Sequence, residues 1–161
     1  MATDKADDVV LRELAAAGIE FVVVGGTAAV LQGAPVFTED LDIVHRRTPE
    51  NVERLLAWLV ARGAYHRYDL SNRKLPPTRE QLLGTGQLNF ETTLGKIDTL
   101  CELGPGEGYE QILGDAIDIG GIPVLGLERL IAVKARANRP KDRATLPVLI
   151  ATLDERSRRS R

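Results

Sequence analysis

The stretch VVVGGTAAVLQGAPVFTEDLDIV, residues 22–44, decides the fold of this chain. Its opening valines end an apolar, β-branched run that predicts a buried strand. The strand breaks at Gly25-Gly26, and the residues TAAVL that follow predict a short helix. The last part, DLDIV over residues 40–44, alternates polar and apolar side chains as a half-buried strand does. The stretch therefore predicts a strand, a glycine turn, a helix and a strand in direct succession.

Elements on both sides extend this unit into an α/β layer. Thr48 and Pro49 form a strong helix start, because a threonine hydroxyl can cap the helix and proline suits its first position. Hydrophobic periodicity predicts helices over residues 8–17, 48–62, 109–113, 127–137 and 141–153. Short apolar or alternating runs predict strands over residues 19–24, 64–68, 87–92, 96–101 and 122–124. This order predicts an α/β (α+β) fold, in which helices flank a mixed sheet and two helices end the chain.

Length and composition fit one ordinary globular domain. The chain has 161 residues, and about 150 residues per domain is usual. We expect a single domain over residues 1–154, followed by a basic, disordered tail over residues 155–161. The alternative for the tail, whose arginines are interspersed with serines, is a contact with RNA phosphates or with a protein partner.

Charge and hydropathy exclude several classes of protein. The formal net charge of −2 argues against a protein that coats nucleic acid through bulk electrostatics. No run approaches the roughly 18 apolar residues of a membrane span, and the N-terminus has no apolar signal region. The single cysteine, Cys101, cannot form an internal disulfide, which is compatible with a reducing compartment. We therefore expect a cytoplasmic protein with no membrane contact.

A glycine turn follows the first strand of the central stretch. Gly25, Gly26 and Thr27 connect that strand to the short helix. Glycines allow a backbone turn to approach a phosphate closely and to offer it N–H groups. The alternative is a purely structural turn, since glycine pairs between strands and helices are common. The turn alone is therefore a weak indication of a nucleotide site.

Two acids follow on the second strand. Asp40 and Asp42 are two positions apart, so on a strand their side chains point to the same face, with roots roughly 7 Å apart. Carboxylates at this spacing can be bridged through cations, and Mg²⁺ usually binds through one or two carboxylates plus substrate phosphate. The alternative is an exposed strand face, where two acids are tolerated.

A third acid lies in the later hairpin. Asp98 belongs to the otherwise apolar-leaning strand of the sequence GKIDTL. If this strand lies beside that of Asp40 and Asp42, the three carboxylates repel one another, and divalent cations relieve the repulsion. Such a cluster is unfavourable without metal, which favours a functional site.

Together these motifs resemble the pattern of the nucleotidyltransferase superfamily, with its polymerase beta-like minimal nucleotidyltransferase fold. That pattern is a Gly-Gly or Gly-Ser turn, a spacer, Asp-x-Asp and a later strand acid. More closely, the chain resembles a small bacterial branch related to the AbiEii-type toxin nucleotidyltransferases. Three segments carry this closer resemblance, namely Pro49-Glu50-Asn51, Leu130-Ile131-Ala132-Val133-Lys134 and Arg139-Pro140-Lys141-Asp142. The resemblance covers residues 19–150.

The resemblance implies a nucleotidyltransferase-like fold and a role for each matching residue. The ligands of Mg²⁺ or Mn²⁺ would be Asp40, Asp42 and Asp98. The same three acids would be the catalytic residues. Asp98 would share a metal or accept the proton of the attacking hydroxyl. Nucleotide phosphates would be held by Gly25, Gly26, Thr27, Thr38, Lys134 and Lys141. The alternative for both lysines is a solvated helix surface, because position in a helix does not show which way a side chain faces.

The implied function is metal-dependent transfer of a nucleoside monophosphate from an NTP, such as ATP, to a hydroxyl on tRNA, a protein or a small molecule. The same resemblance implies a toxin–antitoxin context, with a cognate toxin or antitoxin protein as partner. One alternative is a non-catalytic nucleotide-binding or antitoxin-like module of the same fold. Another is a dinucleotide-binding domain, because Asp42 follows Gly25 at about the 20-residue distance of a ribose-binding acid. A dinucleotide-binding phosphate loop needs a third glycine, which this chain lacks. A dinucleotide-binding domain would also leave Asp40 and Asp98 unexplained.

Overall fold

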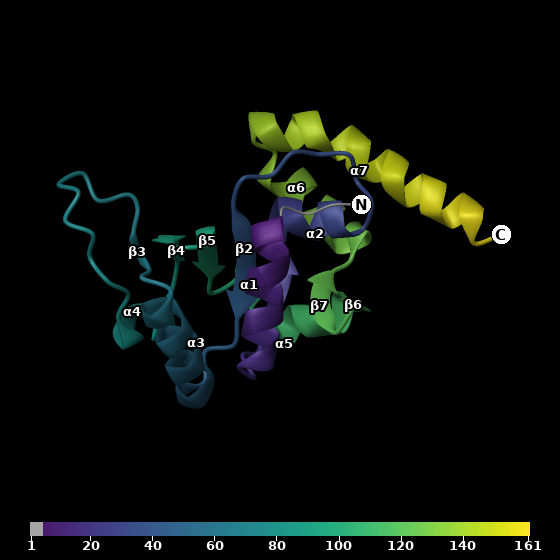
Figure 1. The fold of residues 1–161 in the computed structure, drawn as a ribbon. Coiled ribbons are helices and arrows are strands. Elements are labelled where there is room, and N and C mark those ends of the chain that lie inside the picture. Colours follow the sequence, from purple (N-terminus) through teal and green to yellow (C-terminus); the bar gives the residue numbers. More distant parts are fainter. Residues whose placement is uncertain (1–4) are drawn as a thin grey trace.

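The computed structural model describes residues 5–161, with Lys5 placed by its backbone only. Its centre is a seven-stranded mixed sheet in the order β3-β4-β5-β2-β1-β7-β6 (Figure 1). The strands are β1 (Phe21–Val24), β2 (Leu41–His45), β3 (Tyr65–His66), β4 (Gln87–Thr92), β5 (Gly95–Leu100), β6 (Ala116–Ile119) and β7 (Ile122–Leu125). The helices are α1 (Lys5–Ala16), α2 (Gly25–Leu31), α3 (Pro49–Ala61), α4 (Arg79–Leu83), α5 (Tyr109–Ile112), the 3₁₀ turn η1 (Leu113–Asp115), α6 (Leu127–Ala137) and α7 (Pro140–Arg159). This mixed α/β architecture confirms the predicted fold class.

β1 lies inside the sheet and sets the position of the acids. It pairs antiparallel with β2, which places Val24 opposite Asp42, and β2 pairs parallel with β5, which places Asp42 opposite Asp98. Every residue of β1 is buried. Because side chains alternate along a strand, Phe21 and Val23 face one side of the sheet, whereas Val24, Asp42 and Asp98 face the other.

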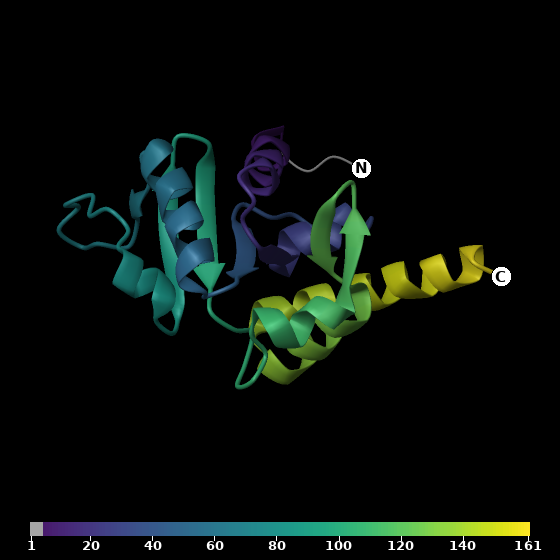
Figure 2. The ribbon, with the colours of Figure 1, turned by 90° about the horizontal axis from the view of Figure 1, so that it is seen from below.

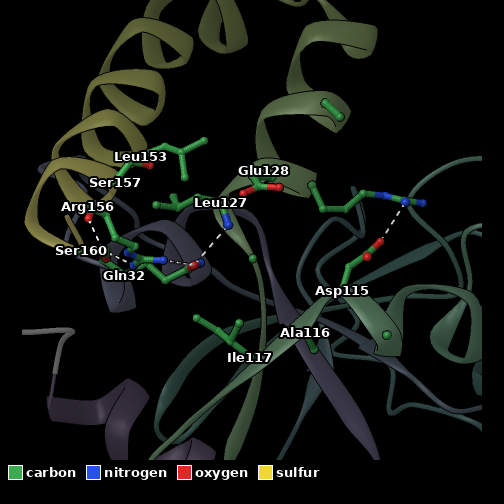
Figure 3. A pocket seen from close by; sticks show the side chains of 14 residues that line it. Gln32, Asp115, Ala116, Ile117, Leu127, Glu128, Leu153, Arg156, Ser157 and Ser160 are labelled. Carbon is green, nitrogen blue, oxygen red and sulfur yellow. Dashed lines mark hydrogen bonds and ion pairs between the residues drawn. The ribbon is translucent and has the colours of Figure 1, made fainter.

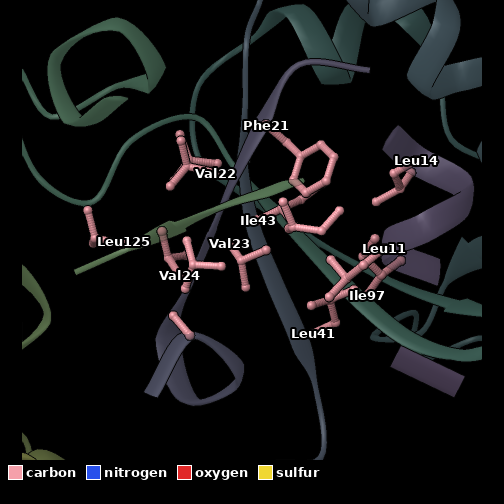
Figure 4. Close-up of a cluster of buried hydrophobic side chains, with 14 of the residues drawn as sticks. Leu11, Leu14, Phe21, Val22, Val23, Val24, Leu41, Ile43, Ile97 and Leu125 are labelled. Carbon is pink, nitrogen blue, oxygen red and sulfur yellow. The ribbon is translucent and has the colours of Figure 1, made fainter. Parts of the chain in front are cut away.

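The face opposite the acids carries a large part of the apolar core. Figure 4 shows Leu11 and Leu14 of α1 on the same side of β1 as Phe21, Ile43 and Ile97. All five side chains are buried. Full burial of one such side chain contributes about 1.5–3 kcal/mol. A shift of the strand pairing by one residue would turn these apolar side chains to the other face of the sheet. The core therefore fixes the strand register, and the register fixes the face that the acids occupy.

The helix start predicted at Thr48 is confirmed. The Thr48 side chain accepts a hydrogen bond from the backbone N–H of Asn51, and Pro49 begins α3. The Asn51 side chain then ties the helix to the sheet. Its Oδ1 accepts from the backbone N–H of Glu20 at 2.7 Å, and its Nδ2 donates to the carbonyl of Arg46 at 2.8 Å. One short sequence signal therefore both starts α3 and anchors it.

α4, β6 and β3 differ from what the sequence predicts. α4 was not expected, and it begins with a capping box between Thr78 and Gln81. β6 was also not expected, and it pairs with β7 across Gly120-Gly121, both of which have positive φ angles. The edge strand expected over residues 64–68 is shortened to β3, because only two of its residues pair with β4.

The C-terminal end is helical in the structure. α7 continues to Arg159 and extends beyond the sheet (Figure 2). Arg156 donates to the carbonyl of Gln32 at 3.0 Å, and Arg159 pairs with Glu155 one helical turn earlier. Cations in the last turn also suit the helix dipole. The structure therefore places residues 155–159 in a helix, where the sequence predicted a disordered tail. None of the helices within residues 5–161 is long and apolar enough to cross a membrane.

Candidate active site

β1 leads directly into the glycine pair. α2 begins at Gly25 itself, rather than after the pair, and Gly25 has a φ of 65°. A Cβ on Gly25 would lie 2.4 Å from Oδ2 of Asp42, and a Cβ on Gly26 would lie 2.9 Å from Oγ1 of Thr38. Real Cβ atoms do not approach other atoms so closely. A side chain at either position would have to displace Asp42 or Thr38, and Gly25 brings the backbone against the Asp42 carboxylate.

Asp40, Asp42 and Asp98 line one cavity of about 750 Å³. Asp42 and Asp98 are partners in the parallel pair of β2 and β5 and point to the same face. Asp40 lies just before β2, which begins at Leu41, and not within the strand as expected. The hydroxyl of Thr38 donates to the carbonyl of Asp40 at 3.1 Å. The three acids thus meet although they come from segments more than fifty residues apart in the chain.

An arginine that no sequence motif pointed to joins two of the acids. Nη1 of Arg67 donates to Oδ1 of Asp98 at 2.6 Å, and Nη2 donates to Oδ2 of Asp40 at 3.1 Å. Nη1 also donates to the carbonyl of Phe90 at 3.1 Å, and the guanidinium lies 4.8 Å from the centroid of the Tyr68 ring. Arg67 directly follows the edge strand β3. The sheet order, in which only β4 separates β3 from β5, brings Arg67 to Asp98.

Asp42 bears the crowding of negative charge. Burial, followed by the nearby charges of Asp98 and Asp40, raises the pKa of the Asp42 carboxyl from 3.8 to about 7. Lys141 acts in the opposite direction. Asp98 accepts hydrogen bonds from Arg67 and, at 3.3 Å, from Nε2 of Gln87. No cationic side chain of the described residues donates to Asp42, so a cation in this cavity would relieve Asp42 most.

The donor set fits a divalent cation of the Mg²⁺ type. Oδ1 of Asp40 is buried and has no hydrogen-bond partner among the described residues. Mg²⁺ prefers oxygen ligands and usually takes one or two carboxylates plus phosphate oxygens. Within residues 5–161, no three His, Cys, Asp or Glu side chains are arranged to hold a metal by themselves. Asp42 and Asp98 form the adjacent carboxylate pair, because they are register partners on β2 and β5. Arg67 holds Asp40 and Asp98.

Basic side chains of α6 and α7 form another wall of the cavity. Lys134, Arg139 and Lys141 line it together with the acids. Asp142 is completely buried and pairs with Nζ of Lys134 at 3.4 Å and with Nε of Arg139 at 2.7 Å, which fixes both cations. Lys141 is exposed and forms no ion pair within the described part of the chain. Lys141 is therefore the most available of these side chains for an anionic ligand.

A second cavity, of about 510 Å³, lies on the Gly26 side of the acids. Its walls include Thr38, Thr145 and Phe37, whose side chain is 86% exposed. The two cavities share Gly25, Asp40, Asp42, Lys134, Arg139 and Lys141. Thr27 lines neither cavity, because its side chain is completely buried. The structure therefore brings together all the predicted site residues except the side chain of Thr27.

A further pocket, of about 730 Å³, lies away from the acids, between β6, α6 and α7 (Figure 3). The Gln32 side chain there accepts from the backbone N–H of Leu127 at 3.1 Å, and the Gln32 carbonyl accepts from Arg156. Asp115 pairs with Arg129 at 2.9 Å. None of the predicted site residues, all of which the structure describes, lines this pocket. Its contacts join α2, α6 and α7.

The sequence matches no family model and no curated protein. The structure is similar to that of the lincosamide antibiotic adenylyltransferase LnuA with lincomycin bound. The TM-score is 0.63, with 14% identity, over 94% of this chain and 98% of that chain. The fold is nucleotidyltransferase-like. JHP933 from Helicobacter pylori gives a TM-score of 0.43 and 20% identity over 81% of this chain and 53% of that chain. The likeness to LnuA shows a shared fold, and membership of the superfamily and of its AbiEii-type branch stays a prediction.

Proposed function

We propose that this chain is a metal-dependent nucleotidyltransferase that moves a nucleoside monophosphate from an NTP to a hydroxyl acceptor. The observation that carries the proposal is the meeting of Asp40, Asp42 and Asp98 with Lys134 and Lys141 around one cavity of a nucleotidyltransferase-like fold. Crowded carboxylates beside lysines suit a metal–triphosphate complex, because the metal needs anionic oxygens and the phosphates need cations.

Each side of the cavity would bind a different part of that complex. Asp40, Asp42 and Asp98 would hold Mg²⁺ or Mn²⁺, which when bound neutralises phosphate charge and favours loss of the hydroxyl proton. Lys141 and Lys134 would bind phosphate oxygens. Gly25 and Gly26 have no side chain in the way of a phosphate that approaches their backbone. The hydroxyl of Thr38 holds the carbonyl of Asp40 and so positions the loop between the glycines and the acids.

The transfer itself is a displacement at phosphorus. The acceptor oxygen forms a bond to the α-phosphorus, the bond from that phosphorus to the bridging oxygen breaks, and pyrophosphate leaves with the electron pair. Asp98 would accept the hydroxyl proton, with its second oxygen oriented by Gln87. The cavities on the two sides of Asp40 and Asp42 offer separate places for nucleotide and acceptor.

A small hydroxyl compound is the acceptor to test first. The neighbour LnuA is described as an adenylyltransferase of lincosamide antibiotics, and its fold extends over almost all of this chain. Hydroxyls of tRNA and of proteins are the other acceptor classes. The proposed toxin–antitoxin context, with a cognate toxin or antitoxin partner, rests on the sequence resemblance alone.

Transfer of label from α-³²P-NTPs tests the proposal. The purified chain is incubated with each NTP, with Mg²⁺ or Mn²⁺, and with small hydroxyl compounds, total tRNA or protein. We expect labelled acceptor and an equal amount of unlabelled pyrophosphate, and EDTA should abolish the formation of both. Asp98→Asn should reduce the rate by about 100-fold or more, as loss of a general base does. NTP binding without any pyrophosphate release would instead support the non-catalytic module.

A further inference from the structure

Arg67 binds two of the three proposed metal ligands at once. Its guanidinium reaches Asp98 at 2.6 Å and Asp40 at 3.1 Å, through different nitrogen atoms. The Arg67 side chain is 8% exposed and that of Asp98 is 5% exposed. A guanidinium held by two carboxylates where little water competes is bound more firmly than an exposed ion pair. Arg67 is therefore the cation already bound to these two carboxylates.

The Arg67 bridge and a divalent cation draw on the same two carboxylates. A cation shared by Asp40 and Asp98 would take their oxygens at about 2.1 Å, yet Oδ1 of Asp98 and Oδ2 of Asp40 already accept hydrogen bonds from Arg67. A cation and a guanidinium a few ångströms apart also repel each other. Within residues 5–161, the acids accordingly do not form a three-ligand group. The Arg67 bridge and a cation held by all three acids therefore oppose each other.

Arg67 lies at the base of an exposed loop. It begins the loop that connects β3 to α4, which reaches away from the sheet (Figure 1). The next residues are open to solvent, with Tyr68 72% exposed and Leu70 fully exposed. The contacts of the Arg67 guanidinium are polar, apart from the stacking on the Tyr68 ring. Release of the guanidinium therefore breaks polar contacts and the contact with the Tyr68 ring.

We propose that Arg67 is an internal counter-cation that closes the carboxylate site and must release Asp40 and Asp98 before a divalent cation binds all three acids. The inference rests on the proposed function through its metal ligands. Arg67 neutralises the acids while the site holds no metal, and its competition sets the free cation concentration at which the site fills. Loading with metal thereby moves one positive charge out of the carboxylate cluster.

Calorimetric titration with Mn²⁺ alone, without nucleotide, tests the competition. Arg67→Gln removes the positive charge but keeps an amide that can donate to Asp98. Its Mn²⁺ affinity should rise about tenfold or more over wild type, because the cation no longer has to displace a buried guanidinium. Arg73→Gln is the matched control, since Arg73 lies in the same loop but pairs with Asp69 and is 61% exposed. Its affinity should equal that of wild type.

Arginine side-chain NMR of the wild-type protein gives a second readout that needs no variant to fold. The Nη protons of a bridged, buried guanidinium exchange slowly, so distinct Arg67 signals are expected without metal. Titration with diamagnetic Mg²⁺ should remove these signals as the bridge opens. Distinct Arg67 signals that persist at saturating Mg²⁺, or a folded Arg67→Gln variant with equal or weaker Mn²⁺ affinity than wild type, would overturn the proposal.

The outcomes separate this proposal from the proposed function. If Arg67→Gln binds Mn²⁺ more tightly but no NTP is turned over, the counter-cation role is supported and the proposed transferase function is wrong. If label transfer occurs but wild type and Arg67→Gln have equal Mn²⁺ affinities, only the counter-cation role is wrong. If neither protein binds Mn²⁺ or Mg²⁺, both are wrong.

Discussion

Asp42→Asn should stabilise the metal-free protein at alkaline pH. Burial and the neighbouring carboxylates raise the pKa of Asp42 to about 7 in the folded state, above its ordinary 3.8. Between these values the folded state binds a proton that the unfolded state has lost, so the wild-type protein loses stability as the pH rises through this range. Above about pH 7 the full penalty of the crowded carboxylate is present. Asparagine has nearly the same shape and does not ionise, so the variant escapes the penalty.

The size of the effect follows from the two pKa values. Their difference corresponds to about 4 kcal/mol of unfolding free energy. Asp42 keeps some contact with solvent, which screens its charge, so we expect about half of that, about 2 kcal/mol at pH 8. At pH 4 the folded wild-type carboxyl is protonated, and the two proteins should agree within about 0.5 kcal/mol.

Guanidinium chloride denaturation in EDTA, at pH 4, 6 and 8, measures this difference. Subtracting wild type from variant at each pH cancels the titration of distant groups. Asp154→Asn, which changes an exposed aspartate on α7, is the control and should show no pH-dependent difference. The reasoning is refuted if the advantage of Asp42→Asn does not grow between pH 4 and pH 8, or if the variant is less stable than wild type at pH 8.

Three further predictions concern the turn, the core and the basic wall. Gly18 and Gly25 both have positive φ, but only at Gly25 would a Cβ lie 2.4 Å from a carboxylate oxygen. In denaturation experiments Gly18→Ala should therefore lose about 1 kcal/mol and Gly25→Ala clearly more, and equal losses would rule out the contact. Burial lowers the pKa of His45 below 6.5, so stability should fall as the pH drops below about 6.5. His45→Gln should remove that dependence, and an unchanged pH slope would argue against it. Lys141→Gln should weaken NTP affinity, measured by calorimetry, about tenfold and leave the melting temperature unchanged. Lys134→Gln should weaken NTP affinity and also lower the melting temperature, because Lys134 pairs with buried Asp142. Identical melting temperatures for the two variants would contradict this.

The centre of the fold could be predicted because its signals are local. The apolar run of β1, the alternation of β2 and the Thr48-Pro49 helix start each act within a few residues, so sequence periodicity carries them. β6 could not be found in this way, because it is a half-exposed edge strand defined by its pairing with β7. For α4 a local signal did exist, the Thr78-x-x-Gln81 capping box.

In the candidate site, too, only the features set by local sequence could be predicted. Strand alternation suggested that Asp40 and Asp42 share a face, because the direction of a side chain is a local property of a strand. Asp98 was expected beside them only if its strand lay next to theirs, and the parallel pairing of β2 and β5 meets that condition for Asp42. Arg67 was out of reach, since its hydrogen bonds to Asp98 and Asp40 span 31 and 27 residues and depend on the order of four strands. The burial of the Thr27 side chain depends on packing around α2 and was likewise not visible in the sequence.

Crystals grown with Mn²⁺ and a non-hydrolysable NTP analogue test the central claim most directly. We predict an anomalous manganese peak in the cavity, bound by Asp42 and Asp98 at about 2.1 Å, with Asp40 released from Arg67 and the triphosphate against Lys141. Bound nucleotide with no manganese within reach of Asp42 and Asp98, or manganese bound only outside this cavity, would contradict a metal-dependent nucleotidyltransferase site built on these acids.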